Sequence, residues 1–287
     1  MPQTINTNII ALNAQRNLST SQSALASSMQ RLSSGLRVNS AKDDAAGMAI
    51  AERMTAQVRG MNVAARNAND GISLAQTAEG ALGKVSDSLQ RMRELAVQSA
   101  NATNSDSDKD SLDKEFGELA KEIQRVLGGT TFNGLTVLGA DAGAQVFQVG
   151  ANTTSNDTIS ITTTNMTADA DITAVAGTDN NGSGRAVIDN TASAADIRGV
   201  IGDIDTALDT INGERATLGA SQSRFDAAIS NLQISIENQS ASRSRILDTD
   251  FAAETSNLSR ANILQQAGNA MVAQANQLPE QVMQLLR

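Results

Sequence analysis

The 287-residue chain contains no cysteine, no histidine, no tryptophan and no tyrosine. Without cysteine it can form neither disulfides nor thiolate metal sites. Without histidine it lacks the commonest general base and the commonest metal ligand, which excludes a Ser-His-Asp triad and an H-E-x-x-H metalloprotease site. We therefore expect a protein that is not an enzyme and that binds neither a cofactor nor a metal ion.

Large side chains are also scarce, although 40% of the residues are apolar. Much of this apolar content is alanine, and the aromatic residues are 5 phenylalanines. Because large aromatic side chains usually dominate a globular core, thin and elongated helical packing is expected instead.

Charge and hydropathy argue against two classes of partner. The net charge of -9 disfavours nucleic acid, which is held through Lys and Arg contacts to phosphate. No apolar run is long enough to span a bilayer, so no membrane insertion is expected. The first residues also lack a basic segment followed by an apolar block, so the chain is expected to stay in the cytoplasm or to leave without a cleaved signal.

Apolar residues recur every three or four positions through most of the chain, which predicts long helices. A first helix is expected over residues 4–33. A second should start after Asp43 and Asp44, whose carboxylates can cap it, and a third should stop at Gly128. Over residues 197–236 the steps alternate between four and three, which is typical of coiled-coil packing.

The pattern changes between these helical halves. Residues 145–149 and 158–162 are short and β-prone, and the second run alternates polar and apolar residues. Residues 166–195 are too poor in apolar residues for a substantial domain and indicate a short, variable, exposed segment. The predicted fold class is mainly α, an elongated antiparallel helical bundle or coiled coil formed by both chain ends, with a small β-hairpin region in the middle.

Both ends of the chain carry apolar stripes with the spacing of one helix face. The stripes are thin, and such helices are weak alone and need a partner. An ordinary bundle within one chain would explain them. We favour the alternative that the two ends pair with each other and are covered further by other copies of the chain. The residues assigned to this assembly stripe are Leu18, Leu25, Met29, Leu32, Leu264, Met271, Leu278, Val282 and Leu285.

One acidic cluster imitates a metal site. Asp106, Asp108 and Asp110 have the spacing of the start of an EF-hand loop, but Ser111 and Gly117 stand where that loop requires Gly and Glu. We interpret these carboxylates as favourable charge at the start of a helix.

Several longer runs of sequence are more specific than these patterns. They are TINTN at 4–8, QRLSSGLRVNSAKDDAAG at 30–47, RNANDGIS at 66–73, LQRMRELAVQSAN at 89–101, TFNG at 131–134, QVGAN at 148–152 and RSRILDTDF at 243–251. Together they closely resemble bacterial flagellin, the subunit of the flagellar filament. The resemblance covers roughly residues 1–160 and 196–287.

The resemblance implies a domain organisation. The inner domain, which pairs the terminal helices and folds on assembly, would be residues 1–42 and 253–287. The helical rod with its β-hairpin would be residues 43–165 and 196–252. Only residues 166–195 would stand where many flagellins carry a large outer domain.

The resemblance also implies partners and location. Flagellins are exported unfolded through the flagellar secretion channel and assemble outside the cell with other flagellin copies, next to hook-associated junction and cap proteins. An export chaperone would bind the C-terminal helix, about residues 253–287. The host flagellin-sensing Toll-like receptor would contact the positions of Arg91, Leu95 and Glu115.

Three other functions fit less of the sequence. A hook–filament junction protein shares the terminal helices but usually lacks the full runs at 30–47 and 89–101. A metalloprotease carried in the variable segment, as in some flagellins, is excluded by the absence of histidine and by the shortness of that segment. An adhesin would need a folded display domain, for which the chain has almost no room.

Overall fold

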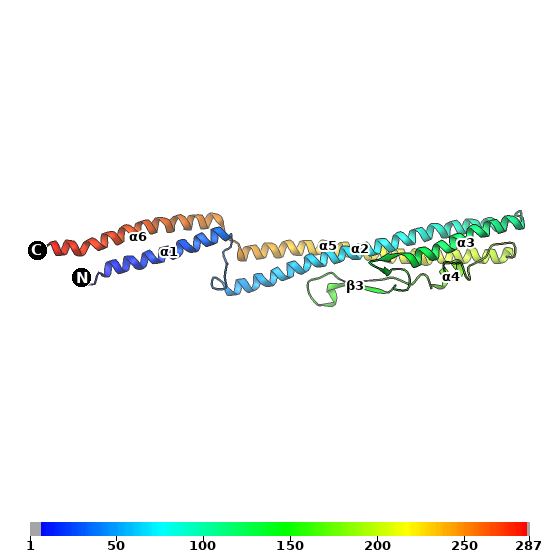
Figure 1. Ribbon diagram of the computed structural model, residues 1–287, viewed down its shortest axis with the longest axis horizontal. Coiled ribbons are helices and arrows are strands. Elements are labelled where there is room, and N and C mark those ends of the chain that lie inside the picture. The colour runs from blue at the N-terminus through cyan, green and yellow to red at the C-terminus, as the bar shows by residue number, and fades with distance from the viewer. Residues whose placement is uncertain (1–6, 286–287) are drawn as a thin grey trace. The chain divides into compact units, whose positions relative to one another are not determined.

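The computed structural model describes the backbone of residues 7–285 and the side chains of residues 7–277. It confirms the expected fold class: mainly α, with the N- and C-terminal helices packed together and small antiparallel strand pairs in the middle (Figure 1). The elements are α1 (Ile9–Ser34), α2 (Ala45–Ser99), α3 (Asp106–Gly129), β1 (Thr131–Phe132), β2 (Leu135–Thr136), β3 (Ala144–Gln148), the 3-10 turn η1 (Ser155–Asp157), β4 (Thr158–Thr162), α4 (Ala170–Ala176), α5 (Ala194–Leu247) and α6 (Phe251–Leu285).

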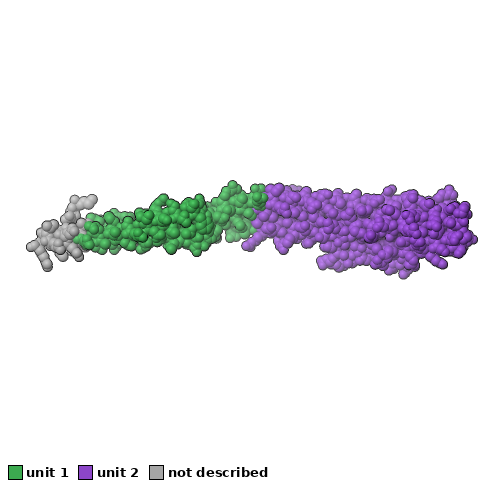
Figure 2. Space-filling model, turned by 90° about the horizontal axis from the view of Figure 1, so that it is seen from above, with its two compact units in different colours: residues 1–56, 237–287 green, residues 57–236 purple. Residues whose placement is uncertain are grey.

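The chain divides into two compact units (Figure 2). Unit 1 comprises residues 1–56 and 237–287, and unit 2 comprises residues 57–236. Both α2 and α5 contribute residues to each unit. This division follows packing alone, so the domain limits implied by the resemblance stay a prediction.

Unit 1 is built on the antiparallel pair α1 and α6. Helix α1 starts one residue after Asn8, whose side chain accepts a hydrogen bond from the Ala11 N–H, as an N-cap does. It ends at Gly35, which has a φ of 72° and therefore takes the left-handed conformation that glycine adopts without strain. Residues 4–6 of the expected first helix lie outside the described part of the chain.

The connection that follows α1 closes against the end of α5. The Arg37 N–H donates to the Leu247 carbonyl over 2.6 Å, and the Arg37 guanidinium donates to the Ile246 carbonyl over 2.6 Å. These bonds satisfy carbonyls that have no partner within α5, because the last turn of a helix leaves its C=O groups free.

The two carboxylates before α2 have different tasks. Asp44 caps α2, since its Oδ1 accepts from the Gly47 N–H over 2.8 Å. Asp43 instead closes the preceding turn by accepting from the N–H groups of Ser40 and Asn39, and these hydrogen bonds lower the pKa of its carboxyl group. Capping was therefore predicted correctly for Asp44, while Asp43 stabilises the turn.

Unit 2 is built on α2, α3 and α5, which lie alongside one another (Figure 1). Their apolar faces form one continuous core, as the four–three spacing predicted. One close approach explains a glycine in the middle of α2. A Cβ atom at Gly71 would lie 2.8 Å from Cζ of Phe225, and the Phe225 ring packs edge-on against Phe147 of β3 with centroids 5.6 Å apart. The largest fully buried side chains of this core include Leu82, Leu89, Met92, Leu95, Phe116, Ile123, Leu127 and Phe225.

The β structure consists of two separate antiparallel pairs. Strands β1 and β2 form a tight hairpin whose turn residues Asn133 and Gly134 have φ of 50° and 85°, as a two-residue hairpin turn requires. Strands β3 and β4 pair from Ala144 with Thr162 to Gln148 with Thr158. The predicted strands at 145–149 and 158–162 therefore exist within one residue of their expected limits.

Residues 166–195 differ from the expected exposed segment. Their loops are exposed, but five apolar side chains are completely or almost completely buried in the core of unit 2. They are Met166, Ile172, Val175, Ala176 and Ile188. Ile172, Val175 and Ala176 have the spacing of one helix face, but α4 has only 7 residues, which is too short a run to give a clear periodic signal.

Candidate functional surfaces

The seam between α1 and α6 is lined largely by small side chains. Ala11, Ala261 and Ala275 are buried there. Leu18 packs over Gly268, where an added Cβ atom would lie 3.2 Å from Cδ1 of Leu18. Small residues let the two helix backbones approach closely, but they bury little apolar area.

Polar contacts hold this seam near both ends. The Asn8 side-chain amide donates to the Ala275 carbonyl over 2.7 Å. Towards the other end of α1, the Arg31 guanidinium lies 3.9 Å from the Glu254 carboxylate, and only 9% of the Glu254 side chain is exposed. The two contacts connect opposite ends of the helices, as an antiparallel arrangement requires.

The predicted assembly stripe divides between two faces of unit 1. Leu18, Leu25 and Leu32 are half-buried in the chain. Three others point outward: Met29 is 58% exposed, Leu264 51% and Met271 61%. The side chains of Leu278, Val282 and Leu285 lie outside the described residues.

Further large apolar side chains of unit 1 are exposed to solvent. Ile9, Ile10, Leu12 and Ile263 are each at least half exposed. Periodicity had not singled out these residues. Unit 1 therefore leaves these large apolar side chains uncovered by its own chain, and exposed apolar surface of this kind can serve as a contact with another protein.

The three positions carried over for receptor contact lie in unit 2. The Arg91 guanidinium on α2 donates to Glu115 of α3 over 2.8 Å and to Glu94 over 2.9 Å, and these hydrogen bonds raise the pKa of Arg91. About half of each side chain in the Arg91–Glu115 pair is exposed. Leu95, however, is 1% exposed and belongs to the core. The structure therefore brings Arg91 and Glu115 together at the surface and places Leu95 beneath it.

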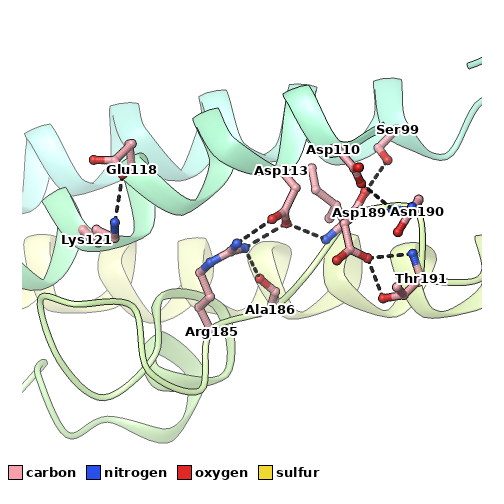
Figure 3. A network of polar contacts seen from close by, with 11 residues as sticks. Ser99, Asp110, Asp113, Glu118, Lys121, Arg185, Ala186, Asp189, Asn190 and Thr191 are labelled. Carbon is pink, nitrogen blue, oxygen red and sulfur yellow. Dashed lines mark hydrogen bonds and ion pairs between the residues drawn. The ribbon is translucent and has the colours of Figure 1, made fainter. Parts of the chain in front are cut away.

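A polar network that the sequence did not reveal ties residues 185–190 to α2 and α3 (Figure 3). The Arg185 guanidinium donates to both oxygens of Asp113 over 2.9 and 2.5 Å, and the Ile188 N–H donates to the same carboxylate over 3.0 Å. The buried Ser99 hydroxyl donates to the Ile188 carbonyl over 2.6 Å. We call residues 185–190 the strap. Asp113 stands on the apolar face of α3, and such a buried acid was the one signal that could have found the network.

The charges of this network are well matched. Burial opposes ionisation of Asp113, but the hydrogen bonds from Arg185 and from the Ile188 N–H outweigh it, so the pKa of Asp113 is lowered. The Asp113 hydrogen bond raises the pKa of Arg185 in turn. Arg185 also lies over the Phe116 ring, 6.0 Å from its centroid, and beside Gly117, where a Cβ atom would meet Nε at 3.1 Å.

The acidic residues at the start of α3 cap the helix and bind the strap. Asp108 and Ser105 form a capping box, and the hydrogen bonds from Ser105 lower the pKa of Asp108. Asp110 accepts from the Asn190 N–H over 3.3 Å. Within the described residues, no group of three or more metal-binding side chains is placed to hold an ion. In the same part of the chain, no helix is long and apolar enough to cross a membrane.

Comparisons with known proteins agree on one family. Residues 5–142 match the family model of the bacterial flagellin N-terminal helical region, and residues 201–286 match that of the C-terminal helical region. A flagellin of Halalkalibacterium halodurans is 46% identical over 283 residues, which cover 99% of each chain. A flagellin of Xenorhabdus nematophila is 44% identical over 315 aligned residues, covering 100% of each chain. The crystal structure of Bacillus cereus flagellin is 34% identical, with a TM-score of 0.48 over 58% of this chain and 88% of that one.

Proposed function

The chain belongs to the bacterial flagellin family, a family of structural proteins and not of enzymes, and we propose that it polymerises into the flagellar filament through its paired terminal helices α1 and α6. The observation that carries this proposal is the set of large apolar side chains that unit 1 leaves exposed. In the filament, neighbouring copies of the chain cover them. The place of the protein is then the extracellular flagellar filament.

The energy available from this contact is substantial. Full burial of a Leu or Met side chain contributes about 1.5–3 kcal/mol. Leu264 and Met271 are each more than half exposed, so covering them contributes roughly 1–2 kcal/mol per side chain. Several such side chains on one unit suffice to offset part of the entropy lost on association.

Seeded polymerisation tests the proposal. Purified chain added to filament fragments should extend them into long filaments visible by electron microscopy. The double substitution Leu264→Ser and Met271→Ser should raise the critical concentration at least about tenfold, because a tenfold change needs about 1.4 kcal/mol. Gln266→Ser, at an exposed polar position of α6, is the matched control. If the double variant elongates at the parent concentration, the exposed face of α6 does not carry assembly.

Export and the remaining partners extend the same proposal. The chain leaves the cell unfolded through the flagellar secretion channel, and the lack of cysteine means that no disulfide has to form outside. An export chaperone covers the apolar face of α6 before secretion, and this prevents premature assembly. Hook-associated junction and cap proteins contact the terminal helices at the two ends of the filament.

Recognition by the host flagellin-sensing Toll-like receptor is proposed for the exposed pair Arg91 and Glu115. Leu95, one turn further along α2 than Arg91, would act indirectly by packing α2 onto the core, because its side chain does not reach the surface. The double substitution Arg91→Ala and Glu115→Ala should lower receptor activation without preventing secretion. The ion pair Arg93–Asp205, 2.7 Å apart and equally exposed, offers a matched control pair on the same unit. A dose response unchanged by the first pair, or changed equally by both, would remove the site.

A further inference from the structure

Helix α6 contains a proline, Pro279, inside its helical limits. Proline has no backbone N–H, so it cannot donate the usual hydrogen bond to the carbonyl four residues earlier. That carbonyl belongs to Ala275. The sequence of α6 therefore leaves one backbone acceptor without its helical partner, at a residue that is 3% exposed.

The side chain of Asn8 meets this acceptor. Its Nδ2 donates to the Ala275 carbonyl over 2.7 Å, while its Oδ1 accepts from the Ala11 N–H over 3.1 Å. One side chain thus caps α1 and hydrogen-bonds the backbone of α6. A buried carbonyl without a donor is costly, so this contact strongly favours one alignment of the two helices.

The rest of the seam specifies alignment weakly. Its buried apolar residues are alanines, and the leucines of α1 recur at seven-residue steps, as Leu18 and Leu25 do. Sliding α1 by seven residues would place Leu25 over Gly268 in place of Leu18 and would keep a similar apolar seam. Polar groups at such interfaces commonly fix register, because a slipped arrangement leaves them unpaired.

We propose that Asn8 and Pro279 together lock the register of α1 against α6: Pro279 frees the Ala275 carbonyl and Asn8 binds it. The contact of Arg31 with Glu254, towards the other end of α1, supports the same alignment. A slip of seven residues would leave both the Ala275 carbonyl and the Glu254 carboxylate without these partners. The proposal concerns the alignment of the two helices within one chain, wherever they pair, and it does not depend on which surface carries polymerisation.

The absence of cysteine makes register directly measurable in the full-length chain. A Cβ atom at Gly268 would lie 3.7 Å from Cβ of Leu18, which is within the Cβ–Cβ distances found in disulfides. The pair Leu18→Cys with Gly268→Cys therefore reports the observed register. Leu25→Cys with Gly268→Cys reports the slipped one, since seven residues displace a helix by about 10 Å. Both pairs are oxidised in a glutathione buffer containing trimethylamine N-oxide, which favours burial. The intramolecular disulfide is then quantified by mass spectrometry.

In the parent chain the 18–268 disulfide should form at least about tenfold faster than the 25–268 disulfide, as expected for a register preference of about 1.4 kcal/mol. Asn8→Asp should lower this ratio at least threefold, because aspartate still caps α1 but cannot donate to Ala275. Pro279→Ala should also lower it, by restoring the competing N–H, even though it raises the helical content. Asn17→Ala, at an exposed position of α1, should leave the ratio unchanged.

Each other outcome overturns the proposal. Equal rates of the two disulfides in the parent mean that no register is fixed. An unchanged ratio in Asn8→Asp removes the role of the Asn8 amide. A higher ratio in Pro279→Ala means that the proline only weakens the helix. If the ratios behave as expected but seeded filaments fail to grow, the failure concerns the proposed function and leaves the register lock intact.

Discussion

The attachment of the strap to α3 gives a prediction whose size follows from the structure. Asp113→Ala removes the acceptor of three hydrogen bonds and leaves the Arg185 guanidinium, 19% exposed, without its counter-ion. Removing one partner of a fully buried ion pair costs about 3–5 kcal/mol. Because water reaches part of both side chains, we expect a smaller loss of about 2–3 kcal/mol.

Hydrogen exchange measures this loss where it occurs. Opening of the strap should become easier by 2–3 kcal/mol, so amides in the peptide containing Ile188 should exchange roughly 30- to 150-fold faster. Glu122→Ala is the matched control, since it breaks an exposed ion pair with Arg125 on the same helix, and exposed pairs contribute at most about 1 kcal/mol. The paired substitution Asp113→Leu and Arg185→Met should restore only part of the protection, because apolar residues can replace a buried ion pair at little cost but leave the Ile188 N–H without its acceptor.

Two results would refute this reasoning. Unchanged exchange at Ile188 in Asp113→Ala would mean that the apolar side chains alone hold the strap. An equal increase throughout α2, α3 and α5 would mean that the ion pair stabilises all of unit 2 and not the strap in particular.

Two further predictions concern the same unit. Gly71→Ala should destabilise unit 2 by about 1–3 kcal/mol, because the new methyl group would lie 2.8 Å from the Phe225 ring. Gly80→Ala, whose methyl group meets no atom within 4 Å, should instead stabilise the unit by roughly 0.5–1 kcal/mol. Thermal unfolding followed by circular dichroism compares the two variants. The folded-state pKa of Asp113 lies below its unfolded value, so the Asp113 carboxylate stabilises the strap above about pH 4, and this stabilisation is lost as the pH falls further. Hydrogen-exchange protection factors at Ile188 should therefore decline below that pH in the parent chain and stay flat in Asp113→Asn.

The helices could be predicted from sequence because their signal is local. An apolar residue every three or four positions marks one helix face whatever that face later contacts. The limits of α3 and of the strands β3 and β4 followed from Gly and from alternation for the same reason. The strap could not be predicted, because its attachment joins Arg185 to Asp113 across 72 positions of the sequence. No local pattern encodes a contact of that range.

The residues of α6 that face α1 could not be predicted for a different reason. Hydrophobic periodicity ranks Leu264 and Met271 above Ala261 and Gly268, and so it predicts a contact stripe through the larger residues. In the structure the small residues face α1 and the large ones face outward. Close approach of two helices selects for small side chains, which hydrophobic periodicity ranks lowest.

This distribution has a consequence for stability. The α6 side of the seam is alanine and glycine, and the leucines of α1 are only half-buried against it. The pair therefore buries little apolar area, and helices of this kind depend on tertiary contacts for most of their stability. If neighbouring copies cover Met29, Leu264 and Met271, as we propose, they bind the folded helices and not the unfolded ones. Mass action then makes folding of unit 1 depend on the concentration of filament ends. Under that proposal, small residues inside and large residues outside describe a subunit that can unfold for export and that becomes stable where it assembles.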